Sequence, residues 1–207
     1  MRVEPGAVGL RPVVDADLEI FLAYEQDSEA VRRSRFRPRE RDAFLNHWRE
    51  RVLADPDCLV RTVTEDGEIA GHVVSWGEDG RRFVGYWLGR AYWGRGVGSR
   101  ALGLFFRQER TRPLYADPFS GNTASVRLLR RQGFEDAGTV RHGDDEHVLL
   151  VLRTPADEEA AETAEGAEGA EGPGEYGECA EYLEHGECAG RKPAALSDGV
   201  LRRSPHG

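Results

Sequence analysis

Three glycines at alternate positions, Gly94, Gly96 and Gly98, stand between a strand-like run and a helix-like run. Glycines leave the backbone N–H groups uncovered by side chains, and the first N–H groups of a helix have no partner within that helix. Such a loop binds phosphate oxygens. The residue types and their spacing therefore predict a phosphate-binding or pyrophosphate-binding loop at the start of a helix.

Two other phosphate-binding motifs can be compared with this loop. A Walker A loop requires a lysine, and no lysine lies near these glycines. The dinucleotide-binding pattern G-x-G-x-x-G/A fits residues 96–101, and Asp117 follows about 20 residues later. However, an antiparallel meander is predicted before the loop, and the remaining chain is too short for a doubly wound sheet. A Rossmann domain is therefore the less favoured interpretation.

A second motif lies in the next helix-like run, where residues 122–134 have the form N-x-x-S-x-x-L-x-x-x-x-G-F. Together with Tyr-Trp-Gly-Arg-Gly-Val-Gly at residues 92–98, it closely resembles the GNAT superfamily of acyl-CoA-dependent N-acetyltransferases. Residues 85–88 and 10–12 resemble its Rim-type branch, which acts on ribosomal-protein N-termini. The resemblance covers about residues 8–153.

The resemblance implies that acetyl-CoA is the co-substrate. The strand ending in Tyr86, Trp87 and Leu88 would diverge from its neighbour and pair with the pantetheine arm as an added strand. Asn122 would contact the same arm near its amides and thiol. The pyrophosphate would be bound by the backbone amides of Gly94, Arg95, Gly96, Val97, Gly98 and Ser99.

Acetyl transfer needs a neutral amine, donors for the developing oxyanion and mild acid help for the leaving thiolate. Many family members carry a tyrosine for the last task, at a position where this chain has Leu129. Ser125 could donate in its place, directly or through water, or be only a helix-surface serine. Asp117 lies where some relatives place a catalytic carboxylate, although it could simply end a strand before Pro118.

The predicted activity is transfer of an acetyl group from acetyl-CoA to a primary amine by direct attack in a ternary complex. The acceptor would be a protein N-terminus or a small molecule. Glu68, Glu78 and His72 are weaker candidates for the base, with His72 expected in the core or on a sheet face, and ordered water could also serve. Because Leu129 leaves the acid step unassigned, a non-catalytic acyl-CoA-binding or regulatory module is the alternative.

Hydrophobic periodicity and turn signals predict the elements that position these residues. The order indicates an α+β fold with a mixed, mostly antiparallel sheet of six to seven strands and about four flanking helices. Strands are expected at residues 8–14, 58–64, 69–76, 82–88, 114–116, 134–141 and 146–152, and helices from Asp15 and at residues 39–53, 96–109 and 121–132.

Charge divides the chain into two parts. Residues 155–207 carry 13 acidic and 4 basic side chains, whereas residues 1–154 carry 24 of each. We therefore predict an acetyltransferase-like domain over 1–154 and a disordered acidic tail, rich in Ala, Glu and Gly, over 155–207. Cys179, His185 and Cys188 in this tail lack a fourth ligand or zinc-type spacing, so no metal is expected.

The balanced charge of the first part argues against a nucleic-acid partner. The chain shows neither a signal peptide nor an apolar run long enough for a membrane span, so a cytoplasmic monomer or homodimer is expected. An arginine-rich segment, residues 31–41, is predicted as a solvated loop. A sharper hypothesis assigns it to an acidic substrate or to docking of the acidic tail.

Overall fold

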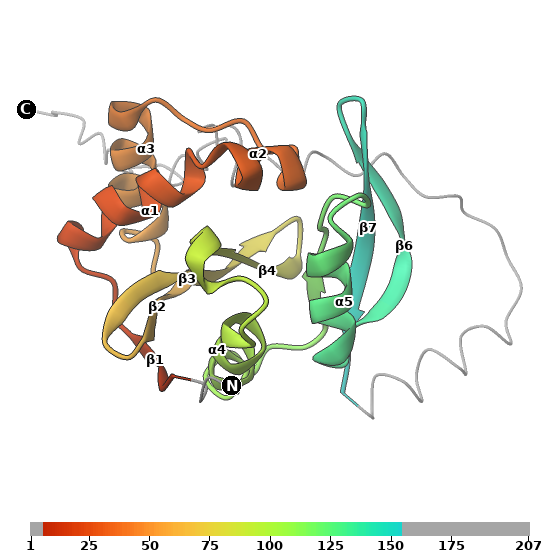
Figure 1. The fold of residues 1–207 in the computed structure, drawn as a ribbon. Helices are drawn as coiled ribbons and strands as arrows, with labels where there is room; N and C mark the ends of the chain where they lie inside the picture. Colours follow the sequence, from red (N-terminus) through yellow and green to blue (C-terminus); the bar gives the residue numbers. More distant parts are fainter. Residues whose placement is uncertain (1–5, 155–207) are drawn as a thin grey trace, which may run out of the picture.

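The structure is a computed structural model that describes residues 6–154, in which helices cover both faces of one seven-stranded sheet (Figure 1). The strands are β1 (Val8–Arg11), β2 (Leu59–Glu65), β3 (Glu68–Glu78), β4 (Arg81–Leu88), β5 (Leu114–Ala116), β6 (Glu135–His142) and β7 (Asp145–Leu152). The α-helices are α1 (Leu18–Glu25), α2 (Ser28–Ser34), α3 (Arg41–His47), α4 (Val97–Phe105) and α5 (Thr123–Arg131). The α+β prediction is confirmed, with one more helix in this part of the chain than expected.

The strand order is β1-β2-β3-β4-β5-β7-β6, and all neighbours are antiparallel except β4 and β5. The parallel pair is short, because only Arg82 with Leu114 and Phe83 with Tyr115 are in register. Beyond Phe83 the two strands separate. The rest of β4 therefore has a partner on one side, β3, and an open edge on the other.

Two tight turns build the central meander. Asp66-Gly67 joins β2 to β3 and Asp79-Gly80 joins β3 to β4, and all four residues have positive φ. Positive φ at both central residues is the type I′ geometry that matches the twist of paired strands. These turns join the strands that were expected at residues 58–64, 69–76 and 82–88.

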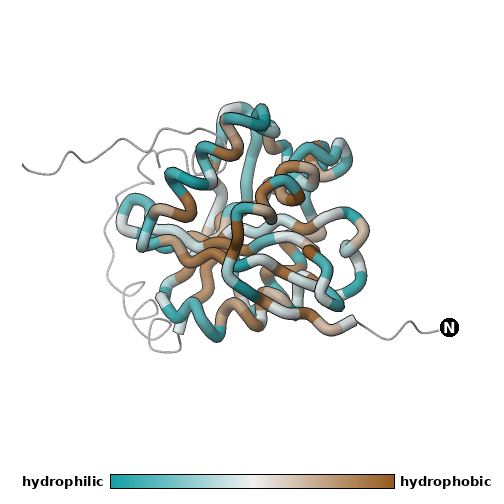
Figure 2. The backbone as a smooth tube through the Cα atoms, turned by 90° about the vertical axis from the view of Figure 1, so that its left-hand side faces the viewer, coloured by the Kyte–Doolittle hydropathy of each residue, from teal (hydrophilic) through white to brown (hydrophobic). Residues whose placement is uncertain are grey.

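Apolar side chains fill a layer on each face of the sheet. α1, α3 and a π-helical turn at Trp48–Val52 pack on one face, and α4 and α5 pack on the other. Hydrophobic segments accordingly concentrate along the central strands, while hydrophilic ones lie on the outer turns of the helices (Figure 2). Within residues 6–154, no helix combines the length and the hydropathy that a membrane crossing requires.

The predicted solvated loop at residues 31–41 is wrong in its first part, where α2 forms. Its start is capped by the Asp27 carboxylate, which accepts hydrogen bonds from the backbone N–H of Glu29 and Ala30. Acidic side chains already pair with five arginines of this segment: Glu29 with Arg32 and Arg33, Asp145 with Arg35, Glu25 with Arg39, and Glu19 with Arg41. The acidic tail predicted for 155–207 lies outside the described residues.

Gly71 in β3 tests the packing of the central strands. Its φ is +152°, and a Cβ there would lie 2.0 Å from the backbone oxygen of Trp87. We expect Gly71→Ala to lower the free energy of unfolding by about 1–3 kcal/mol, measured by urea denaturation. Gly77→Ala is the matched control, because a Cβ there meets nothing within 4 Å. Equal stabilities of the two variants would contradict the expectation.

Glu109 provides a pH-dependent contribution to stability. Burial alone would raise its pKa, but hydrogen bonds from the Ser75 hydroxyl (2.5 Å), the Thr111 N–H (2.8 Å) and the Arg82 guanidinium (2.8 Å) lower the pKa to about 2. A glutamate in the unfolded chain titrates near pH ~4.3. The stabilisation is therefore complete above about pH 5 and is lost as the pH falls towards 2.

We expect the free energy of unfolding to drop by roughly 3 kcal/mol more between pH 5 and pH 2 in the native protein than in Glu109→Gln. Denaturant melts across this pH range measure the difference. The control is Glu135→Gln, because the Glu135 side chain is 60% exposed and its pair with Arg153 spans 3.5 Å. Parallel pH curves for native protein and Glu109→Gln would disprove the role of this carboxylate.

Candidate active site

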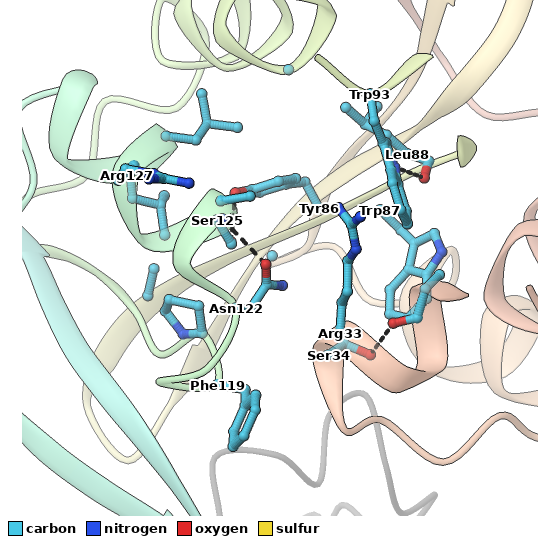
Figure 3. Close-up of a pocket in the computed structure, with 18 of the residues that line it drawn as sticks. Arg33, Ser34, Tyr86, Trp87, Leu88, Trp93, Phe119, Asn122, Ser125 and Arg127 are labelled. Atoms are coloured by element: carbon cyan, nitrogen blue, oxygen red, sulfur yellow. Dashed lines mark hydrogen bonds between the residues drawn. The ribbon is translucent and has the colours of Figure 1, made fainter. Parts of the chain in front are cut away.

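A cavity of about 870 Å³ opens where β4 and β5 diverge. Its walls come from the end of α2, the second half of β4, the loop before α4, the segment after β5, the first turns of α5 and the β6–β7 hairpin. Figure 3 shows Trp93 at one end, Phe119 at the other, and Tyr86, Ser125 and Asn122 between them. The volume is that of a site for a small molecule or cofactor.

The loop at the Trp93 end of the cavity requires glycine for two different structural reasons. Gly94 (φ 70°) and Gly96 (φ 77°) adopt left-handed backbone conformations, and Gly96 is the residue that precedes α4. A Cβ on Gly98 would instead lie 2.9 Å from Leu128 Cδ2, so this glycine allows α5 to approach α4 closely. The loop thus directs the first amides of α4 towards the cavity without side chains in between.

Arg95 is the one predicted cofactor residue whose side chain turns away from the cavity. Its guanidinium pairs with Glu65 at 2.8 Å, and Arg100 of α4 approaches the same carboxylate at 3.4 Å. Glu65 is buried at the end of β2, so the two ion pairs tie the loop and the helix to the sheet. The backbone of Arg95 remains in the loop. The other predicted cofactor residues line the cavity: Tyr86, Trp87, Leu88, Gly94, Gly96, Val97, Gly98, Ser99 and Asn122.

The open edge of β4 faces the cavity. Because Gly89 donates its N–H to Ala70 of β3, the antiparallel alternation turns the backbone groups of Leu88 and Tyr86 towards the gap. The Trp93 indole donates to the Leu88 carbonyl oxygen at 2.8 Å. Backbone groups of an open edge can pair with an extended, amide-bearing ligand.

A pair of hydroxyl groups lies midway along the cavity. The Tyr86 hydroxyl and Ser125 Oγ are 2.7 Å apart, and the Asn122 side chain caps α5 by accepting the Ser125 N–H at 3.3 Å (Figure 3). Burial raises the pKa of Tyr86 to about 12 despite this hydrogen bond. Leu129, by contrast, is fully buried between α5 and the sheet. The sequence analysis used Tyr86 only for its backbone, although alternation along β4 places its ring on the side of α5.

Asp117 forms hydrogen bonds with two histidines at the Phe119 end of the cavity. Its Oδ2 is 2.8 Å from His142 Nε2, and its backbone oxygen is 2.7 Å from His147 Nδ1. The two imidazole rings are perpendicular, with centroids 4.4 Å apart. The sequence analysis predicted Asp117 as a candidate base but did not consider either histidine.

The hairpin register explains why these histidines meet. His147 lies opposite Val140, and His142 follows two residues later, so both imidazoles share one face as diagonal neighbours. The sequence analysis predicted this hairpin but left residues 142–145 as its turn. With His142 assigned to the strand, the alternation would have placed it on the same face as His147.

The three weaker base candidates lie away from the cavity. His72 packs between Phe21 and Trp48 with centroid distances of 4.7 Å to each, and burial lowers its pKa to about 3. Of the two expected positions, core or sheet face, His72 therefore occupies the core. Glu68 is exposed beside the β2–β3 turn, and Glu78 accepts a hydrogen bond from the Trp76 indole at 3.2 Å.

The acetyltransferase (GNAT) domain family matches residues 8–135. The chain belongs to this family. A comparison with curated proteins gives no match to the sequence.

Several solved acetyltransferase structures share the fold. The aminoglycoside acetyltransferase AAC(6')-Ib in complex with coenzyme A has a TM-score of 0.61 and 21% identity, over 75% of this chain and 99% of that chain. A putative phosphinothricin N-acetyltransferase gives 0.58 and 20%, over 71% and 98%. RimL, the ribosomal L7/L12 alpha-N-protein acetyltransferase, gives 0.59 and 18%, over 71% and 90%. Because these acceptors differ widely, the shared fold does not single out the Rim-type branch.

Proposed function

We propose that the protein transfers the acetyl group of acetyl-CoA to a primary amine by direct attack in a ternary complex. One observation supports this most: a single cavity joins a phosphate-binding loop, an open strand edge and a cluster of proton acceptors. These three parts correspond to the pyrophosphate, the pantetheine arm and the reacting amine. A site for a nucleotide alone would not need the open strand edge or the cluster of proton acceptors.

The residues fit acetyl-CoA chemically. Arg127 and Arg131 of α5 line the cavity and supply positive charge for the phosphate groups. The backbone amides from Gly94 to Ser99 would bind the pyrophosphate. A side chain at Gly98 would occupy the space into which Leu128 packs. Asn122, at the start of α5, lies beside the hydroxyl pair where the thioester end of an extended ligand would be held.

Tyr86 and Ser125 would take the place of the missing tyrosine at position 129. Acetyl-CoA supplies an acyl thioester, whose sulfur leaves as a thiolate when the amine attacks. With a pKa of about 12, the Tyr86 phenol keeps its proton at neutral pH. It can therefore donate a hydrogen bond to the departing sulfur, with Ser125 aligning it at 2.7 Å. The groups that would accept the proton of the amine lie around Asp117, at the other end of the cavity.

The acceptor amine is either a protein N-terminus, as in the Rim-type branch, or a small molecule. At pH 7 an α-amine is neutral in about 1 molecule in 6, whereas a lysine side chain is neutral in about 1 in 2,500. An α-amine therefore depends less on deprotonation by a general base. The names of the structural neighbours supply suitable probes of both classes.

The assay follows thiol release from acetyl-CoA with kanamycin, phosphinothricin and a peptide carrying the free N-terminus of ribosomal protein L7/L12. We expect amine-dependent thiol release with at least one of them, together with an acetylated product by mass spectrometry. Binding of acetyl-CoA by calorimetry without turnover would instead support a non-catalytic module. Thermal stabilisation by NAD but not by acetyl-CoA would contradict the proposed co-substrate.

Tyr86→Phe tests the hydroxyl pair. We expect kcat to fall about 10–100-fold, because the donor to the leaving sulfur is lost, while the KM for acetyl-CoA stays within about twofold. Ser125→Ala should lower kcat as well, and the double variant should lose little more than Tyr86→Phe alone. Tyr115→Phe is the control, since this ring packs with Phe83 on the opposite face of the sheet. An unchanged kcat in Tyr86→Phe would assign the acid step elsewhere.

A further inference from the structure

The geometry points to His147 as the general base of the acetyl transfer, with Asp117 and His142 as the residues that position it. This inference rests on the proposed acetyltransferase function and names the group that accepts the proton of the acceptor amine. It differs from the sequence-based hypothesis, in which the Asp117 carboxylate itself is the base.

The hydrogen bond of His147 fixes its tautomer. A backbone carbonyl oxygen can only accept, so the Nδ1 atom that lies 2.7 Å from the Asp117 oxygen carries the proton. The lone pair of the neutral ring is therefore on Nε2. His147 is partly exposed and lines the cavity, so a proton acceptor of defined direction is available to a bound amine.

His142 is in a different situation. Its Nε2 donates to the Asp117 carboxylate at 2.8 Å, its side chain is only 6% exposed, and its Nδ1 is buried. No ring nitrogen of His142 is thus available to an acceptor in the cavity. Its hydrogen bond holds the Asp117 side chain in place, while its ring packs perpendicular to that of His147.

Several charged groups lie around His147. The Asp117 carboxylate is a neighbour, and His142 occupies one of its oxygens. Phe119 packs edge-on against His147, and the Arg35 guanidinium that lies over Phe119 is paired with Asp145 at 3.3 Å. From α2, Arg33 also faces the cavity, but Glu29 pairs with it at 2.7 Å.

The proton balance is simple. His147 Nε2 takes one proton from the acceptor ammonium, and the neutral nitrogen forms a bond to the thioester carbonyl carbon. The C–S bond breaks while the Tyr86 hydroxyl donates its hydrogen bond to the sulfur, and the second proton of the nitrogen goes to that sulfur. The imidazolium then releases its proton to solvent, so that one amide, one thiol and one proton are formed.

The same three residues could in principle bind a metal, since their ligand atoms lie within 4.8 Å of one another. A tetrahedral zinc ion requires ligand atoms about 3.3 Å apart, from bonds of about 2.0–2.1 Å. The imidazole N–H groups that face Asp117 already donate to its oxygens. This hydrogen-bonded arrangement favours a general base with two positioning residues over a metal site.

The test compares the native protein with His147→Asn, with the panel amine that gives the fastest thiol release as acceptor. Asparagine keeps an N–H donor near the Nδ1 position and removes Nε2. We expect the ratio of native to variant kcat/KM, in which titration of the acceptor cancels, to rise from a few-fold at pH 5 to roughly 100-fold at pH 8. Added imidazole should restore part of the variant's activity at pH 8.

Glu146→Gln is the matched control, because Glu146 is an exposed neighbour on β7 whose side chain points to the opposite face from His147. Its kcat/KM should stay within twofold of native at every pH. His142→Gln keeps a donor near the Nε2 position and should retain most of kcat. His142→Phe should lower kcat while leaving the KM for acetyl-CoA unchanged.

A second measurement does not depend on the acceptor. Long-range ¹⁵N–¹H NMR of the native protein should show His147 with its proton on Nδ1, and assignment of the proton to Nε2 would overturn the inference. A native-to-variant kcat/KM ratio for His147→Asn that stays near 1 at all pH values, while Asp117→Asn loses activity, would also overturn it. The same holds if EDTA abolishes the activity and Zn²⁺ restores it. Failure of the native protein to release thiol with any amine would contradict the proposed function itself.

Discussion

The separation of β4 from β5 is the constraint on which the rest of the site depends. Only two residue pairs join these parallel strands, and beyond Phe83 no hydrogen bonds hold them together. An open strand edge inside a sheet would ordinarily be costly, because its N–H and C=O groups need partners. Here the edge faces a cavity of about 870 Å³, where an extended ligand with amide groups can provide those partners.

The two ends of this gap are held by different interactions. At the loop end, buried Glu65 pairs with Arg95 and Arg100, and Gly98 lets Leu128 of α5 pack close to the start of α4. At the other end, Asp117 leaves β5 and is bound through both its side chain and its backbone by histidines of the β6–β7 hairpin. Rigid supports at both ends keep the amides and the proton acceptors at a fixed separation.

The hydroxyl pair in the middle of the cavity comes from two elements that are far apart in sequence. Leu129 fills the core between α5 and the sheet and provides no proton donor. Tyr86 reaches the same region from β4 and meets Ser125 of α5. A phenol hydroxyl is therefore present in the cavity, although it comes from β4 and not from position 129 of α5.

The sequence by itself indicated the seven strands, the two turns of the central meander and the glycine loop, because each depends on local conformation or on apolar periodicity. It also indicated the family through two motifs whose residues are close together along the chain. Only the tertiary structure decided the contacts between residues far apart in sequence: Tyr86 with Ser125, Asp117 with His142 and His147, and Glu65 with the loop. α2 was missed because a run of arginines gives no apolar pattern, although Glu29, which pairs with Arg32 and Arg33, lies in the same helix. Strand register and helix packing bring such groups together, and neither is encoded within a single local stretch of the chain.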